Sequence, residues 1–137
     1  MDLNFRSNLK VSLILCMSIV AFLTSCFQSG PMEGSLYYIT NENGTYSVLK
    51  ILKTDDKGVH IRLYSNQYAS PPSKIDESAL YMAGVDHKPN EGMGMGHLPL
   101  SKASFASWHA TFLQKSTVKS DELEGYKMWL DAQGGYF

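Results

Sequence analysis

The sequence predicts a small α+β fold: a curved antiparallel β-sheet, built as a meander of three to four strands, with two short C-terminal helices. Three observations predict it. Short apolar stretches, one of them strictly alternating, fill residues 35–65 and are separated by tight-turn signals. Two stretches near the C-terminus instead place aromatic and apolar residues at helical spacing. Strands followed by helices, rather than alternating with them, are typical of an antiparallel sheet.

The first two strands form a predicted hairpin. Residues 36–40 are rich in aromatic and β-branched side chains, and residues 45–53 form the second strand. Asn43 and Gly44 lie between them and predict a tight turn, because both residues tolerate positive φ. The next turn, "TDDKG", ends in Gly58, which is expected to take a left-handed backbone conformation.

Residues 59–64, "VHIRLY", alternate strictly between two sets of side chains. The inward set is predicted to pack in the core: Val59, Ile61 and Leu63. The outward set is predicted to face solvent: His60, Arg62 and Tyr64. Period-two alternation of this kind is typical of a strand with one buried and one solvated face. With the hairpin, this strand completes a predicted antiparallel meander over residues 35–65.

A polar loop follows, and residues 79–85, "ALYMAGV", are predicted to form a fourth strand. The stretch "NEGMGMGHLPLS", residues 90–101, is expected to be a loop that its glycines permit and that Pro99 ends. Ser101 then caps a predicted helix, since a serine hydroxyl accepts a hydrogen bond from the free N–H groups of the first turn. The apolar face of this helix has helical spacing: Phe105, Trp108 and Phe112.

The last predicted helix is capped by Ser120 or Asp121 and stops at Gly134 and Gly135. Acidic residues in its first turn suit the positive end of the helix dipole. Its apolar stripe consists of Leu123, Tyr126, Trp129 and Leu130. Both helices are expected to cover the apolar face of the sheet, as in a small half-barrel closed by a helix.

The N-terminal region has the layout of an export signal. Arg6 and Lys10 give a basic start, and residues 11–23 form a mostly apolar run of 13 residues. A membrane-spanning helix needs about 20 such residues, so this run is too short to be one. It ends in Leu23-Thr24-Ser25-Cys26, an apolar residue three positions before a cysteine with small residues between them. This pattern resembles the lipobox of bacterial lipoproteins.

The resemblance implies three segments: residues 1–25 are a signal peptide, residues 26–34 a lipidated N-terminus and tether, and residues 35–137 a single small domain. Cleavage between Ser25 and Cys26 would leave Cys26 to carry a covalent lipid, such as palmitate, and to anchor the chain in the lipid bilayer. The domain would face the extracytoplasmic side. In a Gram-negative envelope, the absence of aspartate after the cysteine favours the outer membrane, with the domain facing the periplasm. An uncleaved anchor or an ordinary secretory signal is the alternative.

Composition excludes several functional classes. The chain has 137 residues, a net charge of −1 and no basic stripe, which argues against electrostatic binding of nucleic acid. Its two cysteines are Cys16, in the signal region, and Cys26. The domain therefore has no thiol for catalysis, for a thiolate metal site or for a disulfide. No cofactor other than the covalent lipid on Cys26 is expected.

Residues 90–101 raise the question of a metal site. Met93, Met95 and His97 would project to one side of an extended chain, and thioether and imidazole ligands suit copper. The alternative is that the glycines serve a close backbone approach or a β-bulge, while the methionines pack in the core. A phosphate cradle is not expected, because neither of the glycine-rich phosphate-binding motifs is present.

No catalytic constellation is visible, and the chain is predicted not to be an enzyme. Ser116 and Lys119 have the Ser-x-x-Lys spacing of penicillin-binding proteins, but the further motifs that those proteins need are missing. His60 is assigned to the solvated strand face, while His87 lies in a loop and His109 near a helix end. No H-E-x-x-H motif supports a zinc hydrolase.

The stretches "GMGHLPLS", "ELEGYKMW" and "GGYF" resemble small uncharacterised bacterial proteins. This resemblance implies that His97, Pro99 and the last helix belong to one structural unit. The functional prediction is a membrane-anchored envelope lipoprotein that acts as a non-catalytic binding or structural module, with an envelope protein as its partner. A specific form of this prediction is a periplasmic immunity-type inhibitor of a toxin. The alternative class is a copper-binding protein that uses Met93, Met95 and His97.

Overall fold

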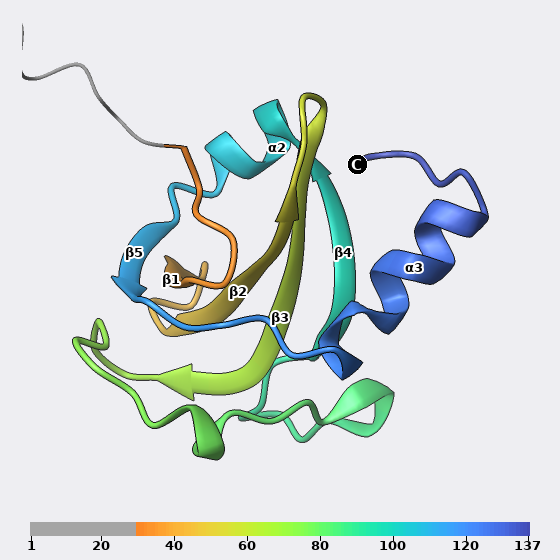
Figure 1. The fold of residues 1–137 in the computed structure, drawn as a ribbon. Coiled ribbons are helices and arrows are strands. Elements are labelled where there is room, and N and C mark those ends of the chain that lie inside the picture. Colours follow the sequence, from red (N-terminus) through yellow and green to blue (C-terminus); the bar gives the residue numbers. More distant parts are fainter. Residues whose placement is uncertain (1–29) are drawn as a thin grey trace, which may run out of the picture. The chain divides into compact units, whose positions relative to one another are not determined.

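A five-stranded antiparallel sheet forms the centre of the fold, in the order β4-β3-β2-β1-β5 (Figure 1). The computed structural model describes residues 30–137, and Pro31–Phe137 form one compact unit. The predicted α+β fold with a small antiparallel sheet and two C-terminal helices is confirmed. The predicted signal peptide, residues 1–25, and the predicted lipidation site at Cys26 lie outside the described residues. Within the described range, no helix is both long enough and apolar enough to cross a membrane.

The predicted meander is confirmed as β1 (Leu36–Thr40), β2 (Tyr46–Thr54) and β3 (Gly58–Tyr68). Gly44 takes a φ of +79° in the turn between β1 and β2, as the Asn-Gly dipeptide predicts. The prediction for Gly58 is wrong, because this residue begins β3 in an extended conformation. Glycine is needed there for space: a β-carbon would collide with the Leu100 carbonyl and the Tyr136 ring.

The predicted fourth strand, residues 79–85, is wrong. That region contains two 3-10 helices, η1 (Glu77–Ala79) and η2 (Gly84–Asp86), and the fourth strand is β4 (Met95–Ser101). The physical reason lies in the apolar side chains that each segment brings to the core. Leu98 and Leu100 of β4 pair with Ile61 and Val59 and pack in the core. In contrast, three large apolar side chains of the earlier segment remain exposed, and only Leu80 packs against the sheet: the exposed three are Tyr81, Met82 and Val85.

The glycine–methionine run is therefore half loop and half strand, and its glycines serve a close approach and a β-bulge. A β-carbon at Gly94 would lie 2.7 Å from the Met82 β-carbon and 2.8 Å from the Ser65 hydroxyl oxygen. The backbone N–H of Gly92 donates to the Ser65 carbonyl at 2.9 Å. The pairing of β4 with β3 shifts register between Ile61 and Leu63, so β4 has one extra residue there.

The first helix, α2 (Lys102–Ser107), is capped by Ser101 as predicted, since the Ser101 hydroxyl accepts from the Ser104 N–H at 3.1 Å. Phe105 and Trp108 pack against the core, but Phe112 does not belong to the helix. The helix is shorter than expected because His109 adopts a left-handed backbone with φ of 48°. The chain then continues as the edge strand β5 (Thr111–Gln114), which pairs with β1.

The last predicted helix consists of a 3-10 turn, η3 (Asp121–Leu123), followed by α3 (Glu124–Asp131). Ser120 is the N-terminal neighbour of η3 but forms no side-chain capping bond. The helix stops before the two predicted glycines, because Gln133 takes the left-handed position with φ of 52°. Leu130 is also misassigned to the apolar stripe, since it is 55% exposed.

Both faces of the sheet are covered, which corrects the prediction of one apolar and one solvated face. One face carries a core that α2 covers: Tyr37, Leu49, Ile51, Val59, Ile61 and Leu100. The opposite face carries a second cluster: Leu36, Val48 and Tyr64. His60 also lies on this second face, and it is 0% exposed because α3 and the residues after it pack over it. The two helices thus lie on opposite sides of the sheet.

Candidate functional site

Four polar side chains form a continuous hydrogen-bonded network on the second face. We call Asp55, His60, His97 and Tyr136 the histidine network. His60 Nδ1 lies 2.9 Å from His97 Nε2, and His60 Nε2 lies 3.0 Å from the Tyr136 hydroxyl oxygen. The Tyr136 hydroxyl in turn donates to Asp55 Oδ2. Turns and strand ends position these residues: Asp55 lies in the β2–β3 turn, His60 in β3, His97 in β4 and Tyr136 after α3.

The carboxylate fixes the direction of every proton in the network. Asp55 only accepts, so Tyr136 donates to it, and the Tyr136 oxygen then accepts from His60 Nε2–H. His60 Nδ1 is therefore unprotonated and accepts from His97 Nε2–H. A neutral His97 is left with Nδ1 as an acceptor at the far end of the network.

Aromatic side chains of α3 surround the two imidazoles. The centroid of the Tyr126 ring lies 4.8 Å from the centroid of the His60 ring. The centroid of the Trp129 ring lies 4.5 Å from it, and both rings meet His60 nearly edge-on. The His97 and His60 rings lie nearly in one plane, with an interplanar angle of 13° and centroids 5.1 Å apart, as a hydrogen bond between two ring nitrogens requires. Gly125 lies directly against His97, because a β-carbon there would be 2.5 Å from the His97 β-carbon. Tyr136 and Phe137 complete the enclosure, since the Phe137 N–H donates to the Pro99 carbonyl at 3.1 Å.

These contacts confirm that His97, Pro99 and the last helix belong to one structural unit.

The histidine network also shifts the pKa values of its members. Burial lowers the pKa of His60 below its ordinary value, although the hydrogen bond and charge of Asp55 oppose the shift. Burial and the neighbouring His60 lower the pKa of His97. The Tyr136 hydroxyl, above all, lowers the pKa of Asp55 to about 2.

We expect the free energy of unfolding to fall as the pH is lowered through and below about 6.5. In the unfolded chain the two imidazoles protonate near 6.5, whereas in the folded chain their pKa values are lower. Below 6.5 the unfolded state therefore binds more protons, and the stability present at neutral pH is lost. A second fall is expected between about pH 4 and 2, because folded Asp55 keeps its charge to about pH 2. Chemical denaturation at a series of pH values measures both.

The variant His97→Gln separates the network from other titrating groups. Its amide retains a donor toward His60 but does not titrate, so the fall in the free energy of unfolding below about pH 6.5 should become smaller. His87→Gln, which changes an exposed histidine outside the network, should leave the fall unchanged. An identical pH dependence in His97→Gln and the parent chain would contradict the prediction.

A second polar cluster on the same face is built around a buried lysine. Lys50 of β2 is 1% exposed, and its Nζ lies 3.0 Å from Glu122 Oε1 and 3.3 Å from Glu77 Oε2. Glu122 is 7% exposed and also accepts from the Lys119 N–H at 2.8 Å. The Tyr64 hydroxyl donates to Glu122 at 3.4 Å. This cluster fixes η3 on the sheet, as the histidine network fixes α3.

The structure does not bring the predicted copper ligands together on one side. Met95 pairs with Leu63, whose side chain packs in the core that α2 covers, whereas His97 faces His60 on the other side. The expectation of a common side for Met93, Met95 and His97 is wrong, because the β-bulge in β4 reverses the alternation between positions 95 and 97. Among the described residues, no group of three or more His, Cys, Asp or Glu side chains is arranged to share a metal ion.

Two of the other singled-out residues, Ser116 and His87, have hydrogen-bond partners. The Ser116 hydroxyl donates to Glu77 Oε2 at 2.6 Å, in the loop before η3. His87 Nδ1 lies 3.1 Å from the Glu91 carbonyl oxygen. His109 follows α2 and forms part of the wall of a surface hollow.

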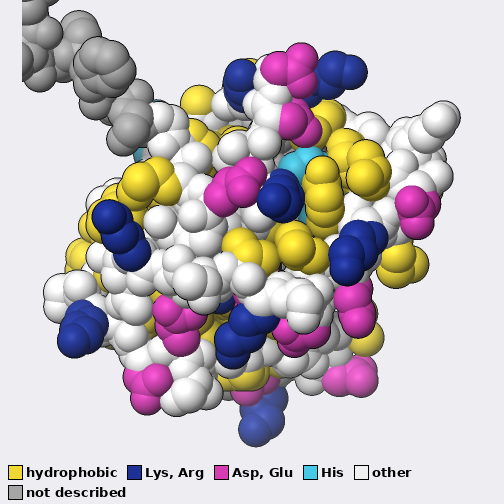
Figure 2. Space-filling model, in the orientation of Figure 1, with side chains coloured by type: hydrophobic (Ala, Val, Ile, Leu, Met, Phe, Trp, Pro, Cys, Tyr) yellow, Lys and Arg dark blue, Asp and Glu magenta, His cyan; other side chains and the backbone are white. Residues whose placement is uncertain are grey.

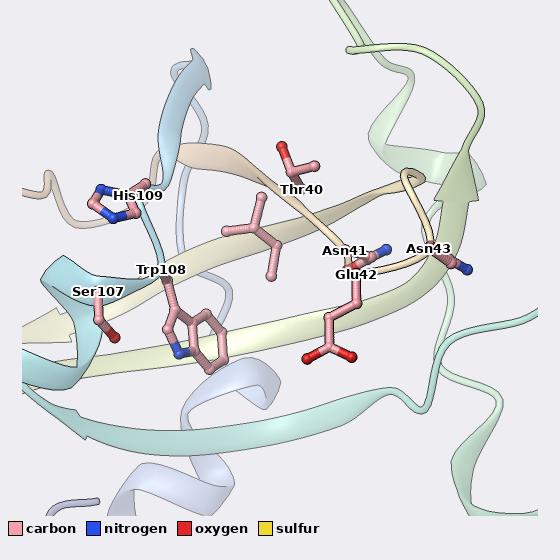
Figure 3. A pocket seen from close by; sticks show the side chains of 8 residues that line it. Thr40, Asn41, Glu42, Asn43, Ser107, Trp108 and His109 are labelled. Atoms are coloured by element: carbon pink, nitrogen blue, oxygen red, sulfur yellow. The ribbon is translucent and has the colours of Figure 1, made fainter.

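This hollow lies between the β1–β2 turn and the end of α2 (Figure 3). It is open to solvent, has a volume of about 870 Å³, and is lined by residues 39–43 together with Ser107, Trp108 and His109. Figure 3 shows the Trp108 indole between Ser107 and the Glu42 carboxylate. Asn41 shapes the turn, since its amide donates to Thr45 and Ser47 at 2.9 Å. Sequence reasoning missed this site because its two halves are far apart in the chain.

The face of the molecule seen in Figure 2 carries charges of both signs. Figure 2 shows acidic and basic side chains interspersed over one face of the molecule, with no area of a single sign. Hydrophobic side chains gather on this face close to the C-terminal end of the chain (Figures 1 and 2).

Comparison with known proteins adds no family to this description. No family model matches the chain, and no curated protein or solved structure matches it either.

Proposed function

We propose that the chain is a membrane-anchored lipoprotein of the bacterial cell envelope, and that its folded part is a non-catalytic binding or structural module. The observation that carries the proposal is Leu23-Thr24-Ser25-Cys26, which follows a basic start and an apolar run of 13 residues and resembles a lipobox. Cysteine suits this position because its thiol accepts a diacylglycerol group. Each buried methylene adds about 0.8 kcal/mol, so two or more acyl chains hold a protein firmly in a bilayer.

The distance between the proposed anchor and the folded unit is short. Four residues lie between Cys26 and Pro31, so five residue-to-residue steps of at most about 3.6 Å each join them in an extended chain. The folded unit would thus stay within about 18 Å of the bilayer surface, on its extracytoplasmic side. Phe27 and Gln28 after the cysteine favour the outer membrane of a Gram-negative envelope, facing the periplasm.

A non-catalytic role is supported by the use that the fold makes of its reactive side chains. The imidazoles of His60 and His97 bond to each other, and the former is fully buried. Lys50 and Glu122 are paired beneath η3. The hollow beside Trp108 offers the folded unit a surface on which to bind a component of the envelope.

Replacing Cys26 with serine is expected to abolish incorporation of a palmitate analogue and to release the chain from the membrane fraction. The physical reason is that serine lacks the nucleophilic thiol on which lipidation depends. Metabolic labelling with an alkyne-bearing palmitate, followed by fractionation of the envelope, measures both effects. The matched control is Cys16→Ser, because Cys16 is the only other cysteine in the sequence and precedes the proposed cleavage point.

Continued labelling of Cys26→Ser, or loss of labelling in Cys16→Ser, would contradict the proposed anchor.

The binding role is tested with the same anchored chain, cross-linked in cells and recovered from solubilised membranes. An envelope component is expected to accompany it. Recovery of the bait alone would overturn that half of the proposal.

A further inference from the structure

We propose that the hollow beside Trp108 binds a carbohydrate, with one pyranose ring stacked on the indole and sugar hydroxyls bonded to Glu42 and His109. This inference rests on the proposed binding role and names the class of ligand. The volume of about 870 Å³ lies within the range of about 300–1,000 Å³ that small-molecule sites occupy.

Unused hydrogen-bonding groups surround the aromatic face. Within the described residues, no side-chain hydrogen bond or ion pair involves Glu42, His109 or the Trp108 indole. The second tryptophan behaves differently, because Trp129 Nε1 donates to the Gly135 carbonyl at 2.9 Å. Figure 3 shows the free groups distributed around the hollow, with Trp108 between Ser107 and Glu42.

The backbone conformation at His109 does not depend on its side chain. His109 directly follows the C-cap residue Trp108 and has a φ of 48°, the position and conformation at which helices usually carry glycine. A non-glycine residue in the left-handed region costs energy that glycine avoids. Gln133 adopts the same conformation after α3, so this backbone does not require an imidazole, and the His109 side chain remains available to a ligand at the wall of the hollow.

The chemistry of the hollow favours a carbohydrate over a cation or a peptide. A site for an organic cation is typically a cage of several aromatic faces, and this hollow has one, Trp108. A bound peptide needs several apolar pockets for its side chains, whereas six of the eight residues that line this hollow are polar: Thr40, Asn41, Glu42, Asn43, Ser107 and His109. A pyranose combines an apolar C–H face with a rim of hydroxyl donors and acceptors. One indole face surrounded by a carboxylate, an imidazole and hydroxyls matches that combination.

The test is isothermal titration of the full chain, purified in a detergent without a sugar headgroup. The probes are chitotetraose and maltotetraose, with choline as the cation probe. We expect one tetrasaccharide to bind with a Kd of about 1 mM or tighter, and choline not to bind. Trp108→Ala should weaken binding about tenfold or more, because the stacking face is removed.

His109→Gly is the sharpest variant, because it separates ligand binding from folding. Glycine suits the left-handed position, so the midpoint of thermal unfolding should stay the same or rise, while saccharide binding weakens about tenfold. Glu42→Gln distinguishes the ligand classes: an amide oxygen still accepts from a sugar hydroxyl, so binding should change less than about threefold, whereas ammonium binding would be lost. His87→Ala, an exposed histidine outside the hollow, should change nothing.

The proposal is overturned if neither tetrasaccharide binds, if choline binds instead, or if His109→Gly binds saccharide as well as the parent chain does. These outcomes are separate from those of the anchor experiment. A chain that is labelled at Cys26 but binds no saccharide keeps the proposed envelope location and loses only this ligand.

Discussion

Replacing Lys50 with methionine is expected to lower the free energy of unfolding by about 3–5 kcal/mol. The ammonium group is 1% exposed and lies 3.0 Å from Glu122, which is itself 7% exposed. Removing it leaves a buried carboxylate without its counter-charge, and breaking a buried pair in this way costs much more than the pair contributes over an apolar replacement. Urea denaturation of the variant and the parent chain at neutral pH measures the loss.

The double variant Lys50→Met/Glu122→Gln tests the reason for that loss. The amide that replaces the Glu122 carboxylate would be uncharged yet still able to accept from the Lys119 N–H, so about 1–2 kcal/mol should be recovered relative to Lys50→Met alone. The matched control is Lys53→Met in the same strand, whose partner Glu33 lies 3.4 Å away with both side chains 40% exposed. A surface pair of this kind contributes about 0–1 kcal/mol. Equal losses at positions 50 and 53 would show that the buried pair has no special role.

Shortening the chain to end at Gly135 is expected to cost about 3 kcal/mol. Four hydrogen bonds disappear with Tyr136 and Phe137, each contributing about 0.5–1.5 kcal/mol: two backbone bonds to Pro99 and Ser101 of β4, and two side-chain bonds of Tyr136. The His60 Nε2–H, buried in the fold, loses its acceptor at 3.0 Å. Urea denaturation measures the cost, and hydrogen exchange at the Ser101 amide should accelerate because that N–H donates to Phe137.

Phe137→Ala is the control for this truncation. The Phe137 side chain is 74% exposed, whereas its backbone forms both bonds to β4, so the substitution should cost less than about 0.5 kcal/mol. If Phe137→Ala costs as much as the truncation, the backbone bonds and Tyr136 are not what holds this segment in place.

The local part of the fold could be predicted from the sequence. The meander of β1 to β3 follows from short-range signals, namely strict alternation in β3 and the Asn43-Gly44 turn. Ser101 was identifiable as a helix cap for the same reason, since the bond that it makes is to Ser104, three residues away. Signals of this kind depend only on neighbours along the chain.

The fourth strand could not be predicted, because two apolar segments competed for one place beside β3. Residues 79–85 look more strand-like by composition than the glycine-rich run, yet Leu98 and Leu100 of that run fill the core. The sequence does contain one indication that both faces of the sheet are covered, although the predicted fold had one solvated face. Residues 48–52 of β2 read "VLKIL", which is apolar on both sides and typical of a strand buried on both faces.

The histidine network could not be predicted from the sequence, for a different reason. Its members come from a turn, two strands and the segment after the last helix, and their proximity depends on the order of strands in the sheet. His60 was assigned to solvent because alternation reports which side a residue faces and not what covers that side. The hollow between residues 39–43 and Trp108 depends on long-range packing in the same way.

The buried lysine also bears on how β2 finds its correct pairing. A strand that is apolar on both faces has a weakly specified register, because a slip by one residue exchanges its two faces at little hydrophobic cost. Lys50 removes that ambiguity. After such a slip its charge would enter the core beneath α2, away from Glu122, whereas the native pairing places it beside the carboxylate. We infer that Lys50 selects a single alignment of the central strand, a contribution to uniqueness of the fold that is distinct from its contribution to stability.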